Sequence, residues 1–571
     1  MKHKKKSIAL FLSAVQIFTF LNAQPKNDWD ITFPLNIPAV VTGSFGELRS
    51  NNFHSGVDFA TNQTIGLPVY SVDDGFVSRV FVSSGGYGKA VYIDHPTGYT
   101  TVYAHLDEFS PEMEKFVNNL QYRRESFNVD HYFKAGEMPV TKGEIIGKSG
   151  NTGSSSGPHL HFEIRETATQ KALSPHFFKL PIKDDIPPTI QAICIYPMGD
   201  SSEVNGKNEP LYIQVVSADG QFNLNNNPTI TASGNIGIGI EVIDYYNNRR
   251  GKCGVYSILL LADNQRVFQS KLDGVLFDQR RYLNSHVDFA RQRTTGKWVQ
   301  KSFVDANNRL NIYTTNRQRG IVEMLPDSTH TFKYEVTDPA GNVSTLSFNI
   351  KGVEQQPEVP SFRPMRLSAF LSYSTEIDGF KVNFPANSFY TDVPAHFSVE
   401  PNTGLGFGDY FKILDETIPI HKNYEITIPI PDDLKGKKGL CGARINKGKL
   451  VHVTGKVSHG DMVITTREAG TYTLNVDSVA PTIRLRNTPQ ERNYTNLKEI
   501  RIEIKDDFSG IKSYRCTLDG KWQLFEYDAK NHVLIGTFDK MRIEKGKRHA
   551  LVVKVTDNAG NERTFSTNIV Y

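Results

Sequence analysis

The chain has 571 residues, of which 39% are hydrophobic and 22% charged, and this ordinary globular usage excludes a largely disordered protein. Its formal net charge is +4, which the four lysines at positions 2 and 4–6 account for fully. The rest of the chain is neutral and lacks the basic surface that binds nucleic acid, so we expect no nucleic-acid partner. At about 150 residues per domain, this length predicts about four domains.

Residues 1–23 have the pattern of a signal peptide. The basic start precedes an apolar run from Ile8 to Leu21, and Ala23 is a small residue of the kind that precedes a cleavage site. The run is short for a membrane span, and no other stretch is long and apolar enough to cross a bilayer. We expect the chain to be secreted across the inner membrane and to be located in the periplasm or at the cell surface. After removal of the signal peptide, we expect no transmembrane helix. An uncleaved anchor is the alternative.

Residues 25–183 are rich in strand-forming segments punctuated by glycine. Ala90–Asp94 and Tyr99–His105 are two β-prone runs joined by four residues that end in Gly98. Two such runs around a short glycine-containing loop are typical of a β-hairpin.

An inserted loop follows this hairpin and contains a predicted helix from Pro111 to Leu120. Ser110 suits the N-cap, and proline suits the first helical position. Four apolar residues have the i, i+3, i+4, i+7 spacing of an amphipathic helix: Met113, Phe116, Val117 and Leu120. We expect this apolar face to pack onto the N-terminal domain and to form one wall beside its cleft.

Beyond a proline-containing linker at 184–188, an internal repeat begins. The segments 188–190, 240–244 and 336–342 recur as 481–483, 502–506 and 555–561. Each copy alternates apolar and polar residues and closes with an Asp-x-Ala-Gly-Asn turn, which is typical of an antiparallel β-sandwich. The first copy is longer, with an insertion near Leu272–Asn316.

These patterns give the expected domain order. A signal peptide at 1–23 precedes a domain at 25–183, an Ig-like β-sandwich at 186–352, a β-rich domain at 360–476 and a second Ig-like β-sandwich at 479–571. Phe380–Phe384 and Tyr424–Ile430 are expected strands of the third domain. Neither sandwich shows His, Cys or acidic residues at ligand spacing, so we expect spacers or binding modules.

The four cysteines do not form a metal site. Cys194, Cys253, Cys441 and Cys516 are widely spaced and include no C-x-x-C pair, which argues against a zinc–thiolate centre. Buried free thiols and one disulfide both fit the sequence.

Three short motifs in the N-terminal domain carry the chemistry. They are centred on His54 to Asp58, on His105, and on the pair His159 and His161. The last two histidines lie two apart in a β-prone run, so both point to one face of a strand. Gly56 allows a turn that brings the His54 imidazole and the Asp58 carboxylate to one metal. The small residues 150–157 let backbone or substrate approach closely.

Together these motifs resemble the lysostaphin-type (LytM) zinc endopeptidase family over about residues 38–180. The family pattern is H-x-x-x-D, then H-L after an aromatic strand, then G-N-T-G-x-S-x-G-P-H-L-H-F-E, and this chain matches it almost letter for letter. Thr42–Gly46 and Arg49 also resemble the start of the family's domain. The long insert after His105 is a departure, because shorter members have only a brief turn there.

The resemblance implies a mainly β fold, in which an antiparallel β catalytic domain with a short helical insert precedes the β-sandwich domains. It implies that His54, Asp58 and His161 bind Zn²⁺ and that His105 and His159 are the catalytic pair. It further implies that a zinc-activated water attacks the amide of peptidoglycan peptides, which makes the protein a cell-wall hydrolase.

Elementary chemistry agrees with this ligand set. Catalytic zinc takes three nitrogen or oxygen ligands and leaves a fourth position open, and its charge lowers the pKa of a bound water and polarises a carbonyl. The domain has no H-E-x-x-H motif and hence no helix-borne glutamate base. His105 and His159 are the candidates for proton transfer or oxyanion stabilisation. Glu163 shares the strand face of His161 and could orient it, although we expect a surface ion pair.

Three other functions remain open. A catalytically silent protein of the same fold could regulate or bind wall hydrolases, but all five site positions are present here, which favours activity. Segments 69–77 and 140–147 resemble strands of a biotinyl or lipoyl carrier, yet no Met-Lys-Met-like tip is present. An adhesin that uses the sandwiches is the last alternative.

Overall fold

The computed structural model describes residues 27–571 except 219, 249–250 and 355–364, so the expected signal peptide at 1–23 lies outside the described residues. The described chain is built mainly from strands, with three short α-helices, which confirms the predicted fold class. None of its helices has the length and apolar character needed to cross a membrane. We describe the chain as four units: the N-terminal (27–182), second (186–352), third (366–476) and C-terminal (479–571) units. Each has a large hydrophobic cluster, and the cluster of the N-terminal unit extends into the second unit and reaches Tyr390 of the third.

The N-terminal unit is organised around one large antiparallel sheet. A second sheet of three strands, β5 (Pro68–Tyr70), β12 (Ile145–Lys148) and β9 (Glu108–Phe109), packs on the same core. The main path of the large sheet is, in order, β1 (Val41–Gly43), β4 (Val57–Ala60), β13 (His159–Glu166), β8 (Tyr99–Leu106), β7 (Lys89–Asp94), β6 (Gly75–Val82) and β10 (Val129–Tyr132).

The predicted hairpin is present as β7 and β8. The two strands pair antiparallel, and the connecting turn is closed by the amide of His95, which donates to the carbonyl of Tyr99. The register shifts near the far end of the pair, where Lys89 is opposite Leu106 but Val91 is opposite Tyr103. This irregularity falls beside His105 and lets its side chain leave the regular alternation of the strand.

The predicted helix is α1, which runs from Pro111 to Arg124 and is therefore longer than expected. Met113, Val117 and Leu120 are buried in the core of the N-terminal unit, so the predicted packing is confirmed. Ser110 occupies the predicted N-cap position and Pro111 the first helical position, but the Ser110 side chain makes no capping hydrogen bond. That this helix lines a cleft stays a prediction.

The second unit contains the first repeat and its insertion. The insertion carries β22 (Gly274–Val275), α2 (Leu283–His286) and α3 (Phe289–Thr295), and β22 pairs with β14 (Ala172–Leu173) of the N-terminal unit. The insertion thus fastens the second unit to the first. The unit's principal strands are β15 (Thr189–Pro197), β17 (Leu211–Ala218), β18 (Gln221–Leu224), β19 (Thr231–Ile243), β20 (Ser257–Ala262), β21 (Gln265–Lys271), β26 (Thr329–Thr337) and β27 (Val343–Gly352).

The third unit has two five-stranded sheets around one core, which makes it a β-sandwich. The two predicted strands are present as β30 and β34. The first sheet contains β29 (Tyr373–Ile377), β30 (Phe380–Phe384), β34 (Tyr424–Pro429), β38 (Asp461–Thr466) and β37 (Gly455–Ser458). The second contains β32 (Phe397–Glu400), β33 (Phe407–Ile413), β39 (Gly470–Val476), β35 (Leu440–Asn446) and β36 (Lys449–Val453).

The C-terminal unit is a smaller sandwich of two four-stranded sheets. One sheet contains β40 (Thr482–Leu485), β41 (Glu499–Lys505), β45 (Val533–Thr537) and β44 (Glu526–Asp528). The other contains β43 (Lys521–Trp522), β42 (Ile511–Leu518), β46 (Arg548–Asp557) and β47 (Glu562–Val570). All four cysteines of the chain are buried free thiols.

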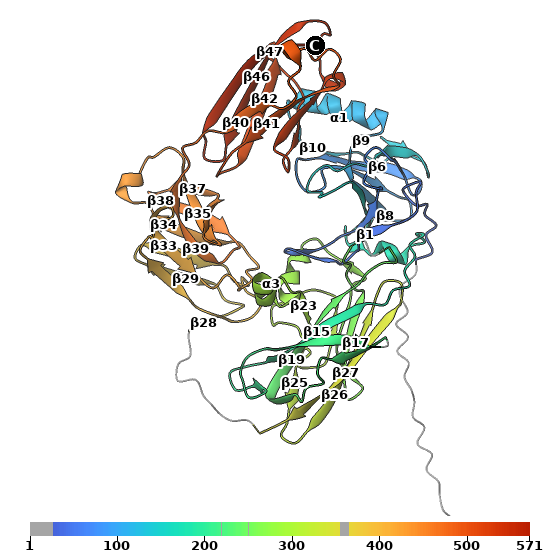
Figure 1. Ribbon diagram of the computed structural model, residues 1–571, viewed down its shortest axis with the longest axis vertical. Helices are drawn as coiled ribbons and strands as arrows, with labels where there is room; N and C mark the ends of the chain where they lie inside the picture. Colours follow the sequence, from blue (N-terminus) through green and yellow to red (C-terminus); the bar gives the residue numbers. More distant parts are fainter. Residues whose placement is uncertain (1–26, 219, 249–250, 355–364) are drawn as a thin grey trace, which may run out of the picture.

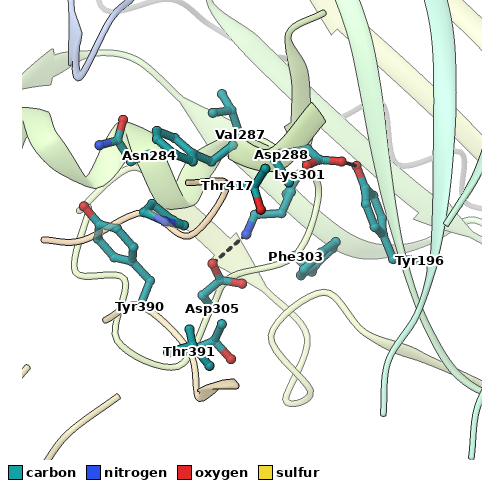
Figure 2. A pocket seen from close by; sticks show the side chains of 14 residues that line it. Tyr196, Asn284, Val287, Asp288, Lys301, Phe303, Asp305, Tyr390, Thr391 and Thr417 are labelled. Carbon is teal, nitrogen blue, oxygen red and sulfur yellow. Dashed lines mark hydrogen bonds and ion pairs between the residues drawn. The ribbon is translucent and has the colours of Figure 1, made fainter. Parts of the chain in front are cut away.

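A cavity of about 230 Å³ lies where the insertion of the second unit meets the third unit. Figure 2 shows that Lys301 and Asp305 form an ion pair in its wall, with Nζ and Oδ2 2.5 Å apart. The hydroxyl of Tyr196 donates to Asp288 on another side, at 2.9 Å. None of the five predicted site residues lines this cavity.

The four units close into a circuit, so that the C-terminal unit lies against α1 of the N-terminal unit (Figure 1). Lys89 Nζ is 2.8 Å from Glu526 Oε2, and Lys540 Nζ is 2.9 Å from Glu526 Oε1 and 2.8 Å from Glu114. Tyr122 of α1 donates to Gln523 at 2.8 Å. A partly buried network of charges therefore joins the N-terminal and C-terminal units.

Candidate metal centre

His54, Asp58 and His161 lie together inside the N-terminal unit. Asp58 on β4 is directly opposite His161 on β13 in the antiparallel register. His161 Nδ1 is 2.9 Å from Asp58 Oδ1, and His54 Nε2 is 3.0 Å from His161 Nδ1 and 3.1 Å from Asp58 Oδ1. All three side chains are buried. The sequence therefore folds these residues into one compact cluster of donor atoms.

Gly56 makes this close approach possible. A Cβ atom at Gly56 would lie 2.4 Å from the carbonyl oxygen of Phe162 and 3.0 Å from the His161 ring. These distances are shorter than van der Waals contact, so any other residue would push the His54–Asp58 turn away from β13. The glycine predicted to permit the turn is thus required for a second reason, which is its contact with the neighbouring strand.

Hydrogen bonds fix which nitrogen of each ring faces the cluster. His54 Nδ1 is 2.8 Å from the carbonyl oxygen of Ser44, and His161 Nε2 is 2.8 Å from Glu163 Oε1. Each of these nitrogens carries a proton and donates it, so the neutral form of each ring presents its other nitrogen, His54 Nε2 or His161 Nδ1, to the centre.

The donor set fits zinc. Two imidazole nitrogens and one carboxylate oxygen are the usual protein ligands of a catalytic zinc ion, at about 2.0–2.2 Å from the metal. Ligands at that distance in tetrahedral geometry are separated by about 3.3 Å. The observed separations of 2.9–3.1 Å are close to this value. Three ligands also leave one tetrahedral position open.

Asp58 is held in the charged state that a ligand requires. Burial raises its pKa, but the His54 charge and hydrogen bonds to the three surrounding histidines together hold the pKa well below its usual value. Arg49 Nη2 donates to Asp58 Oδ2 at 2.7 Å. The guanidinium thus occupies one carboxylate oxygen and leaves Oδ1 for the centre, which gives Arg49 a positioning contact.

Glu163 is not the surface ion pair that we expected. Its side chain is fully buried, with Oε1 accepting from Ser55 and from the Tyr87 hydroxyl at 2.6 Å each. Its other oxygen accepts from Arg165 at 2.6 Å. Burial raises the pKa of Glu163, but the Arg165 charge and the His161 contacts lower it below its usual range. Glu163 is therefore a charged buried group that orients the His161 ring.

His105 and His159 lie beside the three-residue cluster. The His105 ring centroid is 4.8 Å from that of His159 and 5.8 Å from that of His161. His105 Nδ1 donates to the carbonyl of Thr152 at 2.8 Å, and His159 Nδ1 donates to that of Gly157 at 2.8 Å. Each ring is therefore held through its Nδ1, and His159 Nε2 lies 3.4 Å from Asp58 Oδ1.

The environment of His105 keeps its ring neutral. Burial, followed by repulsion from His161 and His159, lowers the pKa of His105 to about 3. Its backbone lies in the left-handed region with φ 61°, a conformation that costs a non-glycine residue about 1–3 kcal/mol and is concentrated at functional sites.

Sequence reasoning did not find Tyr87, whose hydroxyl contacts Ser55, Glu163 and Arg165. Tyr87 lies on the turn between β6 and β7, which places it over the His161 ring at 5.4 Å between centroids. The signal was weak: a tyrosine among glycines at positions 85, 86 and 88 is ordinary turn composition.

Two family models match the chain. Peptidase family M23 matches residues 52–122 and 127–175, and a Zu5-like domain matches residues 370–477. The first match includes all five residues described above. The N-terminal unit is an M23 peptidase domain. This confirms the resemblance to LytM-type enzymes, and the second match gives the third unit a family that the sequence patterns did not suggest.

Named relatives share this likeness over part of their length. An uncharacterized metalloprotease of Haemophilus influenzae is 36% identical over 155 residues, which is 26% of this chain and 27% of that protein. The DD-carboxypeptidase/endopeptidase Mpg of Neisseria meningitidis serogroup B is 37% identical over 118 residues, 21% of each chain. The peptidoglycan DD-endopeptidase ShyA of Vibrio cholerae is 35% identical over 136 residues, 23% of this chain and 25% of ShyA. The chain spans about a quarter of the length of these relatives.

Proposed function

We propose that the M23 domain is a secreted zinc endopeptidase that hydrolyses peptide cross-links of peptidoglycan and remodels the cell wall. The observation that carries this proposal is the convergence of His54, Asp58 and His161, with His105 and His159 at their side. The names of two relatives, which are DD-endopeptidases, support wall peptides as the substrate class.

In this proposal His54 Nε2, Asp58 Oδ1 and His161 Nδ1 hold the zinc ion. Zinc, when bound, acts as a Lewis acid: it polarises the scissile carbonyl and lowers the pKa of a water molecule. His105 and His159 share the remaining tasks, because each ring is held through its Nδ1. In the neutral ring, Nε2 accepts a proton from the attacking water, returns it to the leaving amine and, once protonated, stabilises the oxyanion.

The substrate that we propose is a D,D-type cross-link. The loop before His159 consists of small residues from Gly150 to Gly157, which suits a thin, extended peptide. An extended peptide is held mainly through its backbone, and a meso-diaminopimelate bridge offers few side chains to recognise. A polyglycine bridge meets the same requirement and is the second candidate.

The organisation of the rest of the chain is part of the proposal. We propose a signal peptide at 1–23 and a periplasmic or cell-surface location. We place the peptidase at 25–183, Ig-like sandwiches at 186–352 and 479–571, and the β-rich domain at 360–476. The sandwiches would contact wall or protein partners. The competing function, a silent regulator of wall hydrolases, is disfavoured because all five site side chains are present and lie together.

A substrate panel tests the proposal. We expect the zinc-loaded protein to cleave purified dimeric muropeptides and to leave casein intact, with products identified by mass. Cleavage of pentaglycine alone would keep the mechanism and replace the substrate. Rapid casein cleavage with intact muropeptides would overturn the proposed specificity.

The affinity for zinc is expected to rise with pH. Burial lowers the pKa of His161, but hydrogen bonds to Asp58 and Glu163 and their charges raise it to about 9. A histidine must lose its extra proton to bind a metal, so zinc binding displaces this proton. The apparent affinity should therefore increase about tenfold per pH unit between pH 6 and 9 and level off above. Competition titrations with a zinc-sensitive dye measure it. Glu163→Gln removes part of the raised pKa, so its affinity should level off at a lower pH than that of the wild type.

A further inference from the structure

Three aspartates from distant parts of the second unit meet in its interior. Asp184 lies in the linker after the M23 domain, Asp244 follows β19, and Asp338 begins the Asp-x-Ala-Gly-Asn turn after β26. One carboxylate oxygen from each lies within 4.8 Å of the other two. Asp244 and Asp338 are fully buried, and Asp184 is 9% exposed. Three carboxylates at such short range in a buried place repel one another when all are charged.

Asp244 is the residue that points to a ligand. Its side chain is completely inaccessible, yet neither carboxylate oxygen accepts a hydrogen bond from any described residue. No ion pair of Asp244 is present in the described part of the chain either. Buried polar groups are almost always paired, and a buried carboxylate without a donor costs several kcal/mol or binds a metal. One oxygen of Asp184 is also buried without a partner.

Neighbouring hydrogen bonds fix the Asp338 carboxylate and hold the Asp184 backbone beside it. Asp338 accepts from the backbone amides of Gly341 and Asn342 at 2.7 and 2.9 Å. The Asn342 side chain donates to the Asp184 carbonyl at 3.1 Å and to Asp338 Oδ2 at 2.7 Å. The Asp-x-Ala-Gly-Asn turn of the repeat therefore holds the linker through hydrogen bonds that do not involve Asp244.

The same arrangement occurs in the C-terminal repeat. Asp477, Asp506 and Asp557 hold the three equivalent positions, and one oxygen from each lies within 4.8 Å of the other two. Asn561 donates to the Asp477 carbonyl at 2.8 Å and to Asp557 Oδ2 at 2.9 Å, as Asn342 does in the second unit. Two copies of one sequence pattern therefore build the same triad of carboxylates.

We propose that Asp184, Asp244 and Asp338 bind a calcium ion that fastens the linker behind the M23 domain to the second unit. The three side chains supply only oxygen ligands, which suits a hard divalent cation rather than zinc. Magnesium usually keeps several waters, and two fully buried ligands leave little room for them.

Calcium binding by the zinc-loaded full chain tests the proposal. Isothermal titration with CaCl₂ over about 10 µM to 10 mM covers the range of extracellular calcium modules. We expect Asp244→Asn to bind one calcium ion fewer than the wild type and Asp433→Asn, an exposed aspartate of the third unit, to bind the same number. An equal number of ions in the wild type and Asp244→Asn, or no calcium binding by the wild type, would overturn the proposal. A parallel titration with MgCl₂ that shows the same one-ion difference at lower concentration would overturn the choice of calcium.

Thermal unfolding separates a metal site from a structural aspartate. Asparagine has the same shape and removes one of three clustered charges, so Asp244→Asn should have an equal or higher Tm than the wild type without calcium. Adding calcium should raise the Tm of the wild type and leave the variant with a smaller increase. A variant that is less stable than the wild type in both buffers, by the same amount, would show that Asp244 serves the fold alone.

Discussion

His161→Ala is expected to lose its zinc and its activity together, whereas His159→Ala should keep stoichiometric zinc and lose turnover. His161 Nδ1 is one of the three donor atoms at the centre, and removing one leaves two ligands, too few to hold the ion tightly. His159 instead directs Nε2 toward Asp58 from outside the cluster. Loss of a proton-transferring histidine typically lowers the rate about 10²–10⁴-fold.

Elemental analysis and muropeptide hydrolysis, measured on the same preparations, distinguish these two effects. His396→Ala is a matched control, because it removes an exposed histidine of the third unit and should change neither property. If His159→Ala lost zinc as fully as His161→Ala, His159 would be a ligand and the proposed division of roles would be wrong. Stoichiometric zinc in His161→Ala would contradict the ligand set.

Glu526→Gln is expected to release the C-terminal unit from the M23 domain without unfolding either. The Glu526 carboxylate pairs with Lys89, which is almost fully buried, and with Lys540. The amide removes the negative charge and leaves two ammonium groups facing each other. Breaking such a hydrogen-bonded charge pair at an interface costs about 2–5 kcal/mol. Hydrogen exchange should therefore increase at residues 118–122 and 523–542.

The matched control is Glu562→Gln. Its carboxylate pairs with Lys554 at 2.9 Å on an exposed face of the same unit, and exposed pairs contribute about 0–1 kcal/mol. Unchanged exchange at the interface in Glu526→Gln would show that the buried pair does not hold the units together. The two lysines lower the pKa of Glu526 to about 2 against the effect of burial. Its contribution is thus complete above about pH 4.5 and is lost as the pH falls toward 2.

The placing of His159 and His161 together at the candidate metal centre could be predicted because these two residues are close in the sequence. His159 and His161 alternate on one strand, and that period of two places both rings on one face whatever surrounds them. The same strand periodicity could not predict that Glu163 is buried. Alternation places it beside His161, but its burial depends on Tyr87, which comes from a turn 76 positions earlier.

Longer-range features were predicted less well. The repeat segments were visible in the sequence, yet their aspartates were not recognised as clusters because positions 184, 244 and 338 have no ligand spacing along the chain. Only the pairing of β15 with β19 and the clasp of the Asn342 turn bring them together. The helix α1 continues past its predicted end at Leu120. Its last turn is held by Gln121, which donates to the carbonyl of Phe127. The spacing of apolar residues, on which the prediction was based, gives no information about such a contact.

The charge network between the first and last units also sets an order of events during synthesis. Glu526 follows the end of the M23 match at residue 175 by 351 positions (526 − 175). At about 5–20 residues per second, the ribosome needs roughly 20–70 s to reach it. Throughout that time Lys89 has no carboxylate from the last unit, and the loop carbonyls of Asn151 and Ser155 lack their Lys530 donor. The peptidase domain thus reaches its final environment only after residues 526–530 have been made and folded into the C-terminal unit.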